Sequence, residues 1–290
     1  MAEAQQQLVF GAHLVWDEGF GEGWTEDDLW GLDQATAHRL LFDSLTETVT
    51  RYKGRTAGWI VVNEVIDAHE DDGIRRDYPW YETLGGPDFI AEAFHAAQDA
   101  DPDALLVLNE FGFETDDEYD TAADKRERAL RVIDGLLEAG APVQALGVQA
   151  HLEGADFASR FDTDAYRQFL GDVADRGLKI LITEMDVLDD GLPPDAAERD
   201  AIVAEMYGTY LDVALAEPAV GALITFGLTD RYTWLQEDYP REDGEPRRPL
   251  PYDEDFQPKP AWEAIETSLA NAPLRGLLWR PLRGQDDAAS

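Results

Sequence analysis

The sequence has no cysteine and only four lysines. The lack of cysteine excludes disulfide bonds and thiolate metal ligands, and it leaves the redox compartment undetermined. No stretch approaches the roughly 20 apolar residues of a membrane-spanning helix. The start of the chain has neither a basic segment nor a long apolar run, so the sequence predicts no signal peptide and leaves the localisation unknown.

Positive charge is also scarce, because 23 basic residues stand against 61 acidic ones and give a formal net charge of −38. A surface of this sign repels nucleic acids and anionic membranes, so we expect neither as a partner. The acidic residues are spread along the whole chain rather than gathered in a tail. We interpret this as a halophilic adaptation, in which salt screens the repulsion between like charges. The alternative is an ordinary acidic enzyme.

The hydrophobic content of 44% is enough for a large core. Apolar patterns predict strands at 8–17, 59–64, 105–109, 143–151, 179–184 and 221–226, and helices at 35–52, 87–100, 124–139, 163–176, 196–216 and 260–271. Strands that alternate with helices are typical of an α/β fold with a parallel sheet. No linker interrupts the pattern, so we expect residues 1–290 to form a single domain, with 284–290 as a frayed tail.

Two of these apolar strands end in a glutamate, Glu64 and Glu184. An α/β barrel places its chemistry at the carboxyl ends of its strands. A retaining glycosidase needs one carboxylate as nucleophile and a second as acid and then base, about 5 Å apart. In a chain with 61 acidic residues, however, either glutamate could be a solvated residue at the end of a strand.

Polar and aromatic residues beside the strand ends favour the catalytic interpretation. Asn63 can donate an amide proton to a sugar hydroxyl, and His151 can hydrogen-bond a carboxylate at the same edge. A purely structural histidine is the ordinary alternative. The aromatic residues at or just past strand ends are Trp16, Trp24, Phe226 and Trp234. Their faces suit sugar rings, although core packing is the usual role of such side chains.

Taken in order, these motifs resemble one family, glycoside hydrolase family 10, the endo-1,4-β-xylanases. The segments that resemble family motifs are 14–16, 59–64, 108–111, 147–152, 182–186, 225–234 and 256–262. Each motif alone is weakly specific, but the ordered set, over about residues 8–270, is highly specific. The resemblance implies a TIM-type (β/α)8 barrel, retaining hydrolysis of internal β-1,4 bonds of xylan or xylo-oligosaccharides, and no metal or cofactor.

At the level of residues, the resemblance implies that Glu184 is the nucleophile and Glu64 the acid/base. The residues expected to contact or position the substrate are Asn63, Gln149, His151, Trp16, Asp17, Phe226 and Trp234. Asp17 stands where the family has histidine, and its negative charge would raise the pKa values of neighbouring carboxyl groups. Phe226 stands where the family has tryptophan, which keeps apolar area and loses an indole donor.

The strand at 8–17 resembles the third strand of the family, so about six β/α units are visible and the barrel is incomplete at its N-terminus. The family's Glu-Asn-x-x-Lys segment is also missing. Three explanations remain open: the true chain starts upstream of Met1, the sequence is a degenerate fragment, or self-association completes the barrel. The corresponding alternatives to a xylanase are a catalytically inactive or weakly xylan-binding fragment and an enzyme for another β-glycan.

Overall fold

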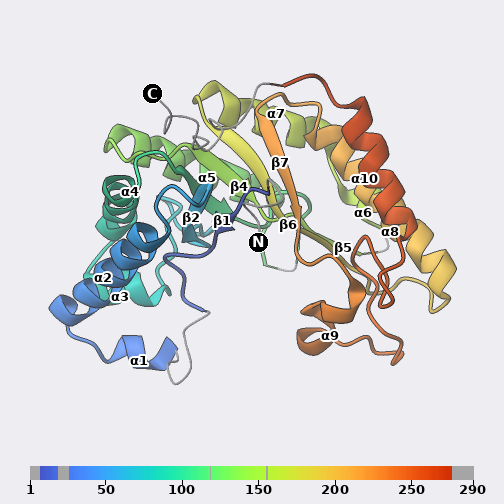
Figure 1. The fold of residues 1–290 in the computed structure, drawn as a ribbon, viewed down its shortest axis with the longest axis horizontal. Coiled ribbons are helices and arrows are strands. Elements are labelled where there is room, and N and C mark those ends of the chain that lie inside the picture. The colour runs from blue at the N-terminus through green and yellow to red at the C-terminus, as the bar shows by residue number, and fades with distance from the viewer. Residues whose placement is uncertain (1–6, 19–25, 118, 155, 276–290) are drawn as a thin grey trace, which may run out of the picture. The chain divides into compact units, whose positions relative to one another are not determined.

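The structure is a computed structural model that describes residues 7–18, 26–117, 119–154 and 156–275 (Figure 1). The described chain has an α/β fold that divides into two compact units. Among the described residues, unit 1 comprises 7–18, 26–110 and 124–147, and unit 2 comprises 111–117, 119–123, 148–154 and 156–275; Trp24 lies outside them. The predicted tail at 284–290 lies outside the described residues. Among the helices that are described, none is long and apolar enough to cross a membrane.

The strands of unit 1 neighbour one another in chain order. They are β1 (Phe10–Gly11), β2 (Gly58–Asn63), β3 (Leu105–Glu110) and, up to Gly147, β4 (Ala145–Val148). β2 pairs in parallel with both β1 and β3, and every residue of β2 and β3 is buried. Burial on both faces explains why these strands are continuous apolar runs rather than alternating ones.

Helices cover the sheet of unit 1. They are α1 (Glu26–Trp30), α2 (Gln34–Tyr52), α3 (Pro79–Leu84), α4 (Asp88–Ala100) and, from Asp124 on, α5 (Ala122–Glu138). α2 begins where the side chain of Asp33 accepts the backbone N–H of Thr36, as a helix N-cap does. Its buried residues include Leu41, Leu45 and Val49, which recur at helical spacing. α2 packs against α4, as Figure 1 shows.

In unit 2, β6 (Lys179–Leu188) lies between β5 (His151–Glu153) and β7 (Val220–Thr225) and is parallel to both. The helices are α6 (Phe157–Arg160), α7 (Thr163–Asp175), α8 (Ala196–Ala214), the short 3-10 helix η2 (Asp230–Tyr232), α9 (Leu235–Asp238) and α10 (Pro260–Asn271). α8 packs against α7 and α10. The buried hydroxyls of Tyr166 on α7 and Tyr210 on α8 share a hydrogen bond of 2.7 Å.

Strands occur at all six predicted positions, and the six long helices lie close to their predicted bounds. Three strand predictions are wrong in detail. The strand predicted at 179–184 continues to Leu188 as β6. The strand predicted at 143–151 is divided into β4 and β5, because Ala150 between them has a φ of +61°. The strand predicted at 8–17 forms ladder pairs only at β1 and at an isolated bridge between Val15 and Val62.

Candidate active site

The predicted site residues fall into two groups, one in each unit. Unit 1 contains Trp16, Asp17, Asn63 and Glu64, and unit 2 contains Gln149, His151, Glu184, Phe226 and Trp234. Within each unit, the structure brings several of these residues together around one of the two glutamates.

The backbone at Glu64 is strained and firmly held. Glu64 directly follows β2 with a φ of +56°, a conformation that residues other than glycine rarely adopt. Its N–H donates to the carbonyl oxygen of Asn109 at 3.0 Å. Asn109 also donates through Nδ2 to Oδ1 of the neighbouring Asn63 at 2.8 Å, and the Tyr78 hydroxyl donates to the carbonyl oxygen of Asn63 at 3.0 Å. Strain that is maintained by such contacts is typical of functional sites.

The carboxylate of Glu64 accepts a hydrogen bond from an indole. Nε1 of Trp16 donates to Oε2 of Glu64 at 3.1 Å. Trp16 is fixed in turn by Trp80, whose Nε1 donates to the Trp16 carbonyl oxygen at 2.9 Å. The indole N–H of Trp16 is therefore engaged by the glutamate, and only its ring face is left for the sugar contact that the sequence predicts.

Asp17 is buried and paired. It is only 5% exposed, and its Oδ2 lies 2.8 Å from Nη2 of Arg75. Burial raises the pKa of Asp17, Arg75 lowers it and the nearby Glu64 raises it, so that the net pKa lies above the ordinary value. Glu64 thus exerts a like-charge effect on Asp17, and the cation of Arg75 opposes it. Arg75 lies between β2 and α3 and belongs to no motif that sequence reasoning singled out.

A second buried ion pair holds the chain just after Glu64. Glu110, at the end of β3, is fully buried, and its Oε2 accepts the backbone N–H of Ile66 at 2.9 Å. Nζ of Lys125 lies 3.2 Å from Oε1 of Glu110 and donates to the Ile66 carbonyl oxygen at 2.7 Å. Sequence reasoning missed this pair, although a lysine beside an apolar helix face is a usable signal in a chain with four lysines.

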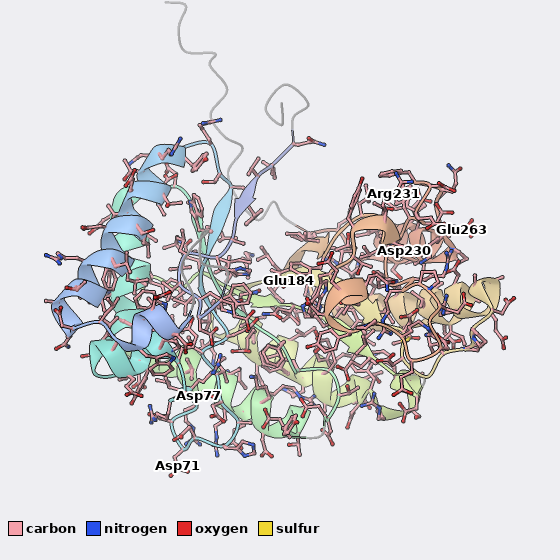
Figure 2. All side chains as sticks on the ribbon, turned by 90° about the horizontal axis from the view of Figure 1, so that it is seen from below. Asp71, Asp77, Glu184, Asp230, Arg231 and Glu263 are labelled. Carbon is pink, nitrogen blue, oxygen red and sulfur yellow. The ribbon has the colours of Figure 1, made fainter. Side chains whose placement is uncertain are left out.

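In unit 2, Glu184 lies within β6 and is 5% exposed, so the strand continues past it rather than ending there (Figure 2). Its N–H donates to the carbonyl oxygen of Gln149 at 3.1 Å, and Gln149 is itself buried. Nε2 of His151 lies 3.4 Å from Oε2 of Glu184. The bend at Ala150 separates Gln149 from His151, and both still reach the same glutamate.

His151 is a cation that is held between two carboxylates. Its Nδ1 lies 2.7 Å from Oδ1 of Asp186, and the other oxygen of Asp186 accepts the indole N–H of Trp234 at 2.8 Å. Burial alone would lower the pKa of His151, but Asp186 and Glu184 outweigh it and raise the pKa from 6.5 to about 10. The imidazole therefore carries a positive charge beside Glu184 at neutral pH. Asp186 is a further site residue that sequence reasoning did not single out.

Aromatic rings surround this histidine. The rings of Phe226 and Trp234 lie edge-on to His151, with centroids 5.5 and 5.6 Å away. Tyr239 extends the cluster, with its ring 5.4 Å from that of Trp234. Phe226 and Tyr239 are 39% and 50% exposed. Apolar ring faces beside a charged group are what a sugar-binding surface needs, since sugars present C–H groups and hydroxyls together.

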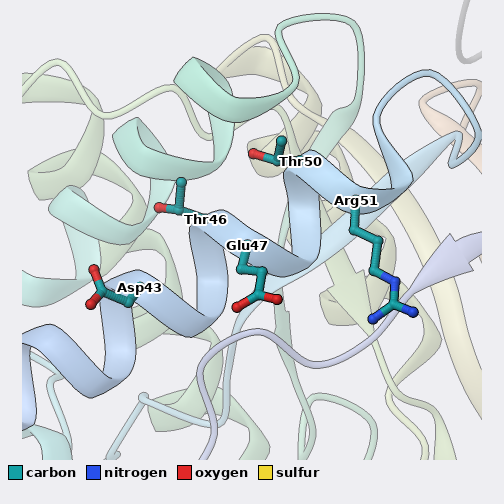
Figure 3. A pocket seen from close by; sticks show the side chains of 5 residues that line it. All are labelled: Asp43, Thr46, Glu47, Thr50 and Arg51. Atoms are coloured by element: carbon teal, nitrogen blue, oxygen red, sulfur yellow. The ribbon is translucent and has the colours of Figure 1, made fainter.

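A groove lies elsewhere, along α2 (Figure 3). It is lined by Asp43, Thr46, Glu47, Thr50 and Arg51, which recur at helical spacing on one helix. None of the predicted site residues lines it, so it is not a candidate for glycosidase chemistry. In the part of the chain that the structure describes, no group of three or more histidine, cysteine, aspartate or glutamate side chains could hold a metal ion.

Comparisons with solved structures agree with this arrangement. Xylanase 10B from Thermotoga maritima superposes with a TM-score of 0.77 and 31% identity, over 93% of this chain and 76% of that one. Xylanase 10B from Thermotoga petrophila, solved in complex with xylobiose, gives a TM-score of 0.76 at 31% identity. The match confirms the predicted α/β fold of the (β/α)8-barrel type. The chain covers about three quarters of the matched xylanase structure.

Sequence comparisons give the same result. Endo-1,4-beta-xylanase B of Thermotoga neapolitana is 31% identical over 262 residues, which are 89% of this chain and 68% of that protein. Endo-1,4-beta-xylanase A of a Caldicellulosiruptor species is 35% identical over 227 residues, only 30% of its length, and other curated relatives are covered over 55% and 62%. Residues 1–268 match the profile of glycosyl hydrolase family 10. Because this match runs through both units and includes every strand that carries a candidate residue, the chain belongs to glycosyl hydrolase family 10.

Proposed function

We propose that the chain is the catalytic domain of a retaining endo-1,4-β-xylanase. Glu184 is the nucleophile and Glu64 is the acid/base. The observation that carries the proposal is the charged His151 beside Glu184. A nucleophilic carboxylate must be ionised, and a cation 3.4 Å away favours the ionised form. The relatives named above are xylanases, and one of them holds xylobiose.

The reaction has two steps. In the first step, a carboxylate oxygen of Glu184 attacks the anomeric carbon while the protonated Glu64 gives its proton to the glycosidic oxygen. The bond from the anomeric carbon to that oxygen breaks, and the leaving sugar departs with a free hydroxyl. In the second step, Glu64, now a carboxylate, takes a proton from water. The water oxygen attacks the anomeric carbon, and the ester bond to Glu184 breaks.

The other predicted residues have supporting roles in this proposal. Asn63 and Gln149 contact the sugar that carries the anomeric carbon, and His151 keeps the nucleophile ionised and oriented. The ring faces of Trp16 and Trp234 contact sugar rings, as does Phe226 with a smaller apolar face. Asp17, which is 5% exposed and paired with Arg75, acts on the substrate mainly through its neighbours.

The experiment is release of reducing sugar from xylan by the whole chain and by its Glu184→Gln variant. Glu263→Gln is the matched control, because Glu263 is exposed on α10 (Figure 2). We expect activity in the chain and in the control and a loss of at least about 1,000-fold in Glu184→Gln, since one essential member of the catalytic pair is removed. For Glu64→Ala, we expect azide to restore turnover of an activated aryl xylobioside, because the activated leaving group departs without an acid and azide attacks the glycosyl-enzyme without a base.

The alternatives give different results. Equal activity in the chain and in Glu184→Gln contradicts the assignment of the nucleophile. No activity in either protein, together with measurable binding of xylohexaose, favours a xylan-binding fragment. Faster hydrolysis of cello-oligosaccharides than of xylo-oligosaccharides favours another β-glycan as substrate, as the changes at Asp17 and Phe226 suggested.

We also propose that the protein works in concentrated salt. The net charge of −38 and the scarcity of lysine support this, and two of the four lysines, Lys125 and Lys259, are buried in ion pairs, so that only Lys53 and Lys179 are exposed. The thermal unfolding midpoint should rise by about 10 °C or more between about 0.1 M and 3 M KCl, as screening removes the self-repulsion. A midpoint that stays constant or falls would contradict the proposal.

A further inference from the structure

We propose that Asp17 and Arg75 act together as one positioning unit for Glu64, and that Arg75 is the residue that permits an aspartate at position 17. The inference rests on the role of Glu64 as the acid/base, which is proposed above. Neither residue is assigned a catalytic step, because both act through the placement of Glu64.

The guanidinium of Arg75 connects the segment before α1 with the loop after β2. Its Nη2 lies 2.8 Å from Oδ2 of Asp17, and its Nε lies 2.8 Å from Oδ1 of Asp77. Its Nη1 donates to the carbonyl oxygen of Glu64 at 3.4 Å. Its central carbon also lies 5.4 Å from the centroid of the Tyr78 ring, within the range of a cation–π contact. A single side chain thus contacts Asp17, Asp77 and Tyr78 as well as the strained residue Glu64 itself.

The same contacts reach the carboxylate of Glu64 indirectly. Asp17 is the chain neighbour of Trp16, and the Trp16 indole donates to Oε2 of Glu64 at 3.1 Å. When Arg75 holds Asp17, it therefore also limits the movement of the indole. Glu64 is positioned twice, at its carbonyl oxygen by Arg75 directly and at its carboxylate through Trp16.

The charge of the pair matters as well. Charged and titratable groups that contact Glu64 or its neighbours in the described part of unit 1 include His13, Asp17, Arg75, Asp77, Tyr78, Glu110 and Lys125. Glu110 is already paired with Lys125, so Arg75 is the cation that balances Asp17. A buried anion that has lost its partner would repel Glu64 whenever Glu64 is ionised. The paired unit adds almost no net charge, which suits a group that must alternate between acid and base.

The test uses the substitutions Arg75→Gln, Arg75→Lys and Asp17→Asn and the double variant Asp17→Asn with Arg75→Gln. Arg76→Gln is the matched control, because it removes the same charge from the next residue, which contacts Asp72 and Tyr81 at the surface. If the pair is one unit, removing only the cation is the most damaging change. The double variant should then recover much of what Arg75→Gln loses, and Arg75→Lys should recover part of it.

The discriminating measurement is kcat/KM on two xylobiosides, one with phenol and one with 2,4-dinitrophenol as the leaving group. Phenol needs a proton from the acid to depart, and dinitrophenol does not. We expect Arg75→Gln to lower kcat/KM about 30-fold for the phenyl substrate and less than about 3-fold for the dinitrophenyl substrate. Equal losses on both substrates would show general structural damage and overturn the proposal. So would a double variant that is no better than Arg75→Gln.

A second readout does not need an active enzyme. The indole N–H signal of Trp16 in a proton–nitrogen NMR spectrum, assigned with Trp16→Phe, reports its hydrogen bond to Glu64. We expect this signal to move upfield in Arg75→Gln and to keep its position in Arg76→Gln. If the chain shows no hydrolysis that depends on Glu184, the proposed function fails, and this signal still decides the positioning role. An unchanged Trp16 signal in Arg75→Gln would refute that role.

Discussion

Asp186→Asn should make the charged imidazole of His151 easier to deprotonate. In the structure, Asp186 is the nearer of two carboxylates that keep this imidazole protonated, at 2.7 Å against 3.4 Å for Glu184. Asparagine keeps the shape and one oxygen for the indole of Trp234 but loses the negative charge. Burial then acts against one remaining carboxylate instead of two, so the pKa of His151 should fall markedly.

The magnitude follows from the pKa of His151 itself. A pKa raised from 6.5 to about 10 corresponds to roughly 5 kcal/mol in favour of the charged imidazole, at 1.36 kcal/mol for each pKa unit. Asp186 makes the larger of the two favourable contributions, so we expect its loss to lower the pKa by about 2 units or more and to cost about 3 kcal/mol of stability near pH 6. Because the folded-state pKa is raised, this stabilisation is complete below pH 6.5 and disappears as the pH rises through about 10. The difference in unfolding free energy between the two proteins should stay nearly constant up to about pH 8, the lowered pKa, and shrink between there and about pH 10.

The assay is NMR titration of the imidazole C–H signals, which are few because the chain has five histidines. His151→Asn identifies the signal of His151. In the unsubstituted chain this signal should not titrate between pH 5 and 8, and in Asp186→Asn it should titrate within or just above that range. The signal of His38, which is exposed on α2, is an internal reference that the substitution should not move. A His151 signal that titrates near its ordinary pKa in the unsubstituted chain would refute the reasoning.

Two further substitutions test how the surroundings of each glutamate are held. Lys125→Met leaves Glu110 buried without this cation, so the free energy of unfolding in urea should fall by about 3 kcal/mol. The addition of Glu110→Gln should restore a substantial part of that loss. A double variant as unstable as Lys125→Met alone would contradict the pairing. Trp234→Phe removes one hydrogen bond to Asp186 and should lower the free energy of unfolding, measured by calorimetry, by about 1–2 kcal/mol. A negligible loss would show that water replaces the indole donor.

The sequence predicted those elements whose signals are local. α2 was expected at 35–52 and occupies Gln34–Tyr52, because an aspartate N-cap, an apolar stripe and a following glycine all act within a few residues. α10 has its predicted bounds, with proline at its first position. The division of the strand at 143–151 was not predicted, since Val-Gln-Ala-His is a regular strand pattern. The bend at Ala150 places the carbonyl oxygen of Gln149 against the N–H of Glu184. Because Glu184 belongs to another strand, β6, no residue within 143–151 signals the bend.

The residues that contact the catalytic candidates could not be predicted from the local sequence for the same reason. The family resemblance indicated Glu64 and Glu184, but it could not show that Arg75 pairs with Asp17, because the two residues belong to separate segments and to no common motif. The sequence pointed to a problem at Asp17, namely an extra anion. Only the fold shows that Arg75, in the loop after β2, pairs with this anion.

The two glutamates have related surroundings that differ in one respect. In each unit a buried aspartate holds a cation near the glutamate, Asp17 with Arg75 and Asp186 with His151. His151 faces the carboxylate of Glu184 directly at 3.4 Å, whereas Arg75 donates to the carbonyl oxygen of Glu64. A cation directly at a carboxylate favours the ionised form, and a cation at a backbone carbonyl oxygen acts on the side chain less strongly. This difference matches the roles proposed here, a nucleophile at Glu184 and an acid/base at Glu64, and exchanging those roles would place the proton donor beside the cation that most disfavours its protonated form.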